Sequence, residues 1–170
     1  MGRIFGICGD YEVDGKWRSE GIAFKGWFVL KEDNTFYGLC MEVFDDDKPK
    51  RRRTDYIRKM NASVPRVIVG ILKKRPDGHD YKIMFYMMSN NASISPLRYT
   101  IPDLGNEHPD EKGYWEWATH DGFQIHGGAR ISIQQYSRES KVAEAFLRKQ
   151  VDQLKNINGN KKYVESVLCS

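Results

Sequence analysis

The sequence predicts a mainly β fold, a single antiparallel meander closed into a barrel or strongly curved, with one α-helix near the C-terminus. Three observations predict it. Polar turns separate runs rich in β-branched and aromatic residues, these runs alternate between apolar and polar residues, and helical apolar spacing occurs only late in the chain. With 170 residues, of which 40% are apolar, the chain is long enough for one core, so we expect residues 1–170 to form a single β-barrel-like domain.

The first predicted hairpin surrounds Asp33-Asn34. A two-residue turn there pairs position 30 with 37 and position 28 with 39, and it sets Lys25 opposite Glu42, an opposite-charge pair that favours this register. The same register collects one wholly apolar face. That face holds Phe24, Gly26, Phe28, Leu30, Tyr37, Leu39, Met41 and Val43.

The second predicted hairpin joins residues 66–73 to residues 81–88. Both strands are apolar on both faces, which is typical of strands that are central in a sheet or covered on both sides. The simplest register sets Lys73 against Lys82, an unfavourable pair that a bulge or a longer loop would relieve.

The third predicted hairpin runs over residues 114–120 and 123–135, with a turn at Asp121-Gly122 and a bend or bulge at Gly127-Gly128. Strict alternation places tryptophan and polar side chains on one face and mainly aliphatic side chains on the other. The sequence leaves open which of these faces is the interior.

One helix is predicted over about residues 138–157, packed on the barrel. Its apolar side chains recur at helical spacing and should face the core. They are Ala143, Phe146, Leu147, Val151 and Leu154.

Gly15-Lys16-Trp17 near the start, together with the hairpin meander and the late helix, resembles the lipocalin and avidin-like (calycin) barrels, whose first strand carries a Gly-x-Trp. The resemblance implies an up-and-down barrel with one ligand-sized cavity and with Trp17 closing its base. It makes a small apolar or aromatic molecule the expected partner.

We therefore expect a non-catalytic small-molecule binding protein. Flat aromatic walls with a few directional polar groups suit such a pocket. The candidate ligand-binding residues are Trp17, Trp27, Trp115, Trp117, Gln124, His126 and Arg130. If Trp115 and Trp117 face outward instead, the same face becomes an interaction surface or a homodimer contact.

A second alternative is an enzyme of the isomerase or cyclase type that needs no cofactor. It would use Glu116 or His120 as its base, with Glu42 as a further inward-facing candidate. We expect no metal site, because strict alternation places His120 and His126 on opposite faces.

The positive charge is local, which argues against a general nucleic-acid binder. A basic patch in a polar connection could bind phosphate, nucleic acid or a nuclear import receptor, although three aspartates precede it. The patch comprises Lys48, Lys50, Arg51, Arg52 and Arg53. Without a signal segment or a membrane-length apolar run, we expect a cytoplasmic protein whose three cysteines are free thiols.

Overall fold

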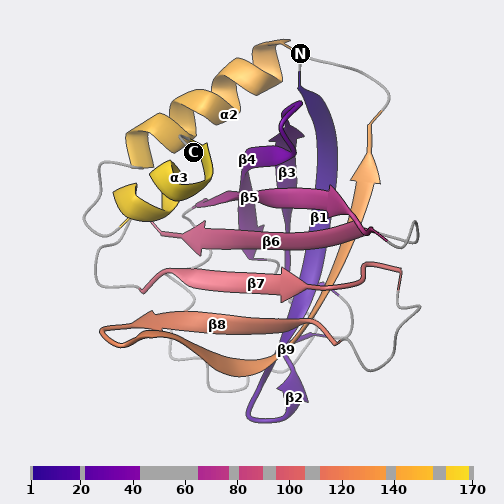
Figure 1. Cartoon of the computed structure of the whole chain (residues 1–170), viewed down its shortest axis with the longest axis vertical. Helices are drawn as coiled ribbons and strands as arrows, with labels where there is room; N and C mark the ends of the chain where they lie inside the picture. The colour runs from indigo at the N-terminus through magenta and orange to yellow at the C-terminus, as the bar shows by residue number, and fades with distance from the viewer. Residues whose placement is uncertain are drawn as a thin grey trace.

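Eight antiparallel strands close into a barrel, and two helices lie against its outer wall (Figure 1). The structure is a computed structural model that describes residues 2–19, 22–42, 65–76, 81–89, 95–105, 112–136, 141–154 and 160–168. The strands are β1 (Arg3–Val13), β2 (Lys16–Trp17), β3 (Phe24–Leu30), β4 (Thr35–Glu42), β5 (Arg66–Lys74), β6 (Tyr81–Met88), β7 (Leu97–Ile101), β8 (Tyr114–Thr119) and β9 (Gly122–Gln135), and the helices are α2 (Lys141–Leu154) and α3 (Lys161–Leu168).

Neighbours in the barrel are mostly neighbours in sequence. From β3 to β9 each strand pairs with the next, and β1 closes the ring by pairing with both β3 and β9. The short strand β2 folds back on the last residues of β1. The predicted mainly β meander barrel with a C-terminal helix is therefore confirmed, and α3 is an additional helix that the sequence reasoning did not predict.

The barrel interior is filled by apolar side chains from all eight strands. Aromatic rings cross its centre in a continuous series, each contacting the next, so the middle of the barrel is packed. The successive ring centroids are 5.2 Å apart for Phe5 and Phe28, 4.3 Å for Phe28 and Phe36, 6.2 Å for Phe36 and Phe85, 5.0 Å for Phe85 and Tyr99, and 5.3 Å for Tyr99 and Phe24.

A second core lies between the outer wall and the helices. Val67 and Val69 of β5 point outward and pack with Leu147 and Val151 of α2, so β5 is covered on both faces, as its two apolar faces predicted. Figure 1 shows α2 and α3 together on the side of the barrel that carries β4 and β5. The expectation that Phe146 faces the core is wrong, since 56% of this side chain is exposed.

The β3–β4 hairpin forms, but its predicted register is wrong by one residue. Leu30 pairs with Phe36, because the loop has three residues and Asn34 adopts a left-handed conformation with φ of 69°. A shift of one residue turns the whole strand over. Tyr37 and Leu39 therefore point outward to the helices, and Lys25 lies opposite Met41 rather than Glu42.

The β5–β6 hairpin keeps the simplest register. Lys73 lies directly opposite Lys82 with no bulge between them. The like-charge pair that the sequence reasoning counted against this register is present in the protein.

The β8–β9 hairpin turns one residue earlier than predicted, at His120-Asp121, so Thr119 lies opposite Gly122. It also contains the predicted irregularity. Trp115 pairs with Gly127 and Glu116 pairs with Ile125, so His126 is an extra residue in β9. A side chain at Gly127 would collide with the backbone of Glu12, which explains why glycine follows the bulge. Past the bulge, the strict alternation assumed from sequence no longer holds.

Candidate ligand-binding site

A cavity of about 410 Å³ opens at one end of the barrel, and we call it the barrel-end cavity. Antiparallel order brings the start of β1 and β6 to the same end as the finish of β3, β5 and β9. The lining residues come from these strands and from the segment after β7. They are Arg3, Phe5, Leu30, Leu72, Tyr81, Leu104, Ile131, Ser132, Ile133 and Gln135.

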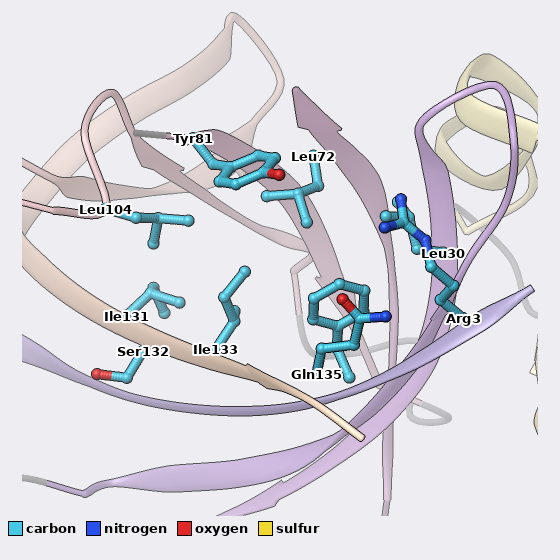
Figure 2. Close-up of a pocket in the computed structure, with 10 residues that line it drawn as sticks. Arg3, Leu30, Leu72, Tyr81, Leu104, Ile131, Ser132, Ile133 and Gln135 are labelled. Carbon is cyan, nitrogen blue, oxygen red and sulfur yellow. The ribbon is translucent and has the colours of Figure 1, made fainter. Parts of the chain in front are cut away.

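The deep wall of the barrel-end cavity is apolar. Leu30, Leu72 and Ile131 are buried members of the interior core, and Phe5 is the first ring of the aromatic series. Figure 2 shows Leu72, Leu104 and Ile133 pointing into a common space, whereas Ser132 points away from it. An apolar ligand that entered here would exchange water for aliphatic and aromatic contacts.

The rim of the cavity is polar. Arg3 and Gln135 are exposed at the ends of paired strands, and Tyr81 is 40% exposed. Among the described residues that line the cavity, Arg3 alone is charged. Its guanidinium lies 5.9 Å from the centroid of the Phe5 ring and forms no ion pair with any residue in the described ranges. A cation above an apolar deep wall suits a ligand that carries one anionic group.

The segment after β7 holds Leu104 in place. The Leu104 N–H donates to the Tyr81 carbonyl at 3.0 Å, and the Arg75 guanidinium donates to the Pro102 carbonyl at 2.7 Å. Asp103 is buried and accepts the Gly105 N–H at 3.0 Å. These bonds make this part of the rim a fixed wall.

The opposite end of the barrel interior carries polar groups. The Tyr11 hydroxyl donates to Glu42 Oε1 at 3.1 Å, and burial, together with the Glu42 carboxylate, raises the pKa of Tyr11 far above its usual value. Burial also raises the pKa of the Cys40 thiol to about 12, so this thiol stays protonated at neutral pH. A protonated, buried thiol is a poor nucleophile.

The face of β8 and β9 that holds tryptophan and polar side chains was predicted to form a pocket wall. The bulge at His126 divides this face. Trp115 points into the core with Ala129 and Ile131, whereas Arg130 points outward and its side chain is 54% exposed. Trp117 is 41% exposed at the end opposite the cavity, where the His126 ring stacks on it at 4.1 Å. Gln124, the partner of Trp117 across the hairpin, is exposed.

The two remaining tryptophans lie outside the barrel interior. Trp27 points outward from β3 and is half exposed. Trp17 lies on β2 rather than on the first strand, with the Arg130 guanidinium 3.7 Å above its ring. Arg130 also pairs with the fully buried Asp10 at 3.1 Å. The role that the calycin resemblance implied for Trp17, closing the barrel base, is therefore replaced by a contact on the outer wall.

The three candidate catalytic residues are not brought together. Glu42 faces inward, but Glu116 faces outward and holds Arg98 with two hydrogen bonds of 2.8 and 3.0 Å. His120 lies in the β8–β9 turn, 90% exposed and 3.2 Å from Asp121. The basic patch at positions 48–53 lies outside the described residues.

Sequence reasoning missed the rim of the barrel-end cavity. Arg3, Tyr81 and Gln135 stand at strand ends and belong to no motif, so only the correct strand order brings them together. The mainly aliphatic face predicted for residues 123–135 includes Ile131 and Ile133, and alternation along the strand was the signal for it.

Comparisons with protein-family models, with curated proteins and with solved structures find no match to this chain. In the described part of the chain, no cluster of three or more metal-ligating side chains occurs. None of the described helices has the length and apolar character needed to span a bilayer.

Proposed function

We propose that this protein binds a small, mainly apolar or aromatic molecule in the barrel-end cavity, with Arg3 meeting an anionic group on the ligand. The observation that carries the proposal is a cavity of about 410 Å³, with an apolar deep wall and a polar rim, in a barrel whose centre is otherwise filled. This volume falls within the range of roughly 300–1,000 Å³ that is usual for small-molecule sites.

The direct test fills the cavity. Ile133→Trp should reduce the affinity for the neutral dye N-phenyl-1-naphthylamine about tenfold or more, because the new ring occupies the space of the ligand. Ile125→Trp makes the same change on the same strand at a side chain that is 67% exposed, and should leave the affinity unchanged. Fluorescence titration measures both, and equal affinities in the two variants would refute the proposal.

Comparing the neutral dye with an anionic dye tests the role of Arg3. The dye 1-anilinonaphthalene-8-sulfonate has a similar ring system but carries a negative charge. Arg3→Gln should lower the affinity for the sulfonate dye about three- to tenfold and leave the affinity for the neutral dye unchanged, because only the charged dye interacts with the guanidinium. Equal losses of affinity for the two dyes would show that Arg3 does not bind the anionic group.

The alternative functions have weaker structural support. An interaction surface formed by Trp115 and Trp117 would lack one of its two indole rings, because Trp115 is only 5% exposed. An acid–base role for Glu116 would compete with its two hydrogen bonds to Arg98.

A further inference from the structure

A second concavity lies on the outer wall of the barrel, across β5, β6, β7 and β8, and we call it the outer groove. Its volume is about 340 Å³. Met84 lines it, whereas the neighbouring residues Ile83 and Phe85 point into the interior core. The outer groove is therefore on the opposite side of the sheet from the barrel-end cavity.

Three cationic side chains line the outer groove. Lys73 and Lys82 face each other directly across two strands, and Arg98 comes from the next strand. Like charges placed directly opposite on a sheet destabilise it. Neither lysine forms an ion pair with any residue in the parts of the chain that the structure describes.

Arg98 is already neutralised and fixed. Glu116 accepts two hydrogen bonds from its guanidinium, which also lies 4.2 Å from the centroid of the Phe123 ring. Three cations and this one carboxylate leave a net charge of 3 − 1 = +2 among the described side chains at the groove. The two lysines carry that excess.

The rest of the lining is less polar. Met84 and Tyr114 are half-buried and offer an aliphatic and an aromatic surface, and Thr100 adds one buried hydroxyl group. A ligand that fits has a compact dianionic group beside a small organic part. A phosphomonoester meets this description, because it carries a charge of about −1.5 to −2 at pH 7 and has three acceptor oxygens.

We infer that the outer groove is a binding site for a phosphomonoester. Lys73 and Lys82 hold the phosphate as two point charges, and Met84 and Tyr114 contact its organic group. The ligand then supplies the counter-charge that the sheet itself does not provide for the paired lysines. This site is independent of the ligand proposed for the barrel-end cavity.

The test uses phenyl phosphate as the probe in isothermal titration calorimetry, with Lys82→Gln as the main variant. Lys82→Gln should weaken binding about tenfold, since it removes a charge-assisted hydrogen bond. Lys25→Gln removes the same charge from an exposed position on β3 and should leave binding unchanged. Wild-type affinity in Lys82→Gln, or no binding to the wild-type protein, would overturn the inference.

The melting temperature of Lys82→Gln shows whether its weaker phosphate binding results from misfolding. Because Lys82→Gln relieves repulsion from Lys73, its free form should unfold at the same temperature as the wild type or at a higher one. A lower Tm accompanied by weaker binding would point to structural damage and overturn the assignment.

Three further binding measurements identify the ligand class and the site. Phenyl sulfate has the same shape with a single charge and should bind at least about fivefold more weakly, and equal affinity would contradict the dianion match. Binding to vesicles that contain phosphatidic acid tests whether the phosphomonoester is a lipid headgroup or a soluble ester. The inference is supported only for a source that binds Lys82→Gln more weakly than the wild-type protein. Ile133→Trp should keep phenyl phosphate binding, whereas its loss there would move the ester to the barrel-end cavity.

Discussion

At the scale of single residues, burial decides which groups are chemically available. Cys40 illustrates this, because its side chain faces the packed interior and burial raises the pKa of its thiol to about 12. Arg3 is the opposite case, since it is exposed at the cavity rim and free of ion pairs with the described residues. The same principle separates Trp115 in the core from the exposed Trp117.

The raised pKa of Cys40 predicts a loss of stability in alkali. The unfolded chain releases the thiol proton near pH 9, whereas the folded protein keeps it up to about pH 12. Deprotonation therefore favours the unfolded state, and this group lowers the free energy of unfolding by about 1.4 kcal/mol per pH unit within that window. Urea unfolding at pH 8, 9.5 and 10.5 should show a shallower decline in Cys40→Ala. Identical slopes in the two proteins would contradict the prediction.

At the scale of elements, the existence of each hairpin could be predicted, but its register only sometimes. Alternation and turn residues located all three hairpins, and the β5–β6 pairing was correct. The β3–β4 pairing failed because Asn34 makes the loop one residue longer than a two-residue turn. In β9, the bulge at His126 turned Arg130 outward and divided the predicted site, since strand alternation carries no signal for an inserted residue.

The loop that sets the β3–β4 register gives a second prediction. Asn34 adopts a left-handed conformation, and its carbonyl accepts the Leu72 N–H at 2.9 Å. Asn34→Val should lower the free energy of unfolding by about 1–2 kcal/mol, because a β-branched residue is strained there. Asn34→Gly should be close to neutral, as should Glu32→Val in the same loop. Chemical denaturation measures all three, and equal losses in Asn34→Val and Glu32→Val would argue against this turn.

At the scale of the whole molecule, the barrel wall separates two cores. Its inner face packs around the aromatic series, and its outer face over β4 and β5 is apolar and covered by α2 and α3. The barrel-end cavity and the outer groove lie on opposite sides of the same wall. The barrel-end cavity depends on closure between β1 and β9, which no local sequence signal encodes, whereas the outer groove lies on the consecutive strands β5 to β8.

Helix docking on the outer wall supplies a third prediction. Val151 of α2 is fully buried in the outer core, whereas Val142 on the same helix is 81% exposed. Val151→Asp should cost about 3 kcal/mol or more, because it buries a carboxylate among apolar side chains. Val142→Asp should stay within about 0.5 kcal/mol of the wild type. Urea denaturation distinguishes them, and similar stabilities would mean that α2 is not needed to cover the barrel.

Intermolecular nuclear Overhauser effects would locate a ligand in the barrel-end cavity without any substitution in the protein. The protein would carry labelled Ile and Leu methyl groups and be mixed with N-phenyl-1-naphthylamine. We expect contacts from the dye to the methyl groups of Leu72, Leu104 and Ile133. Contacts confined to the exposed Ile125, at the opposite end of the barrel, would contradict it.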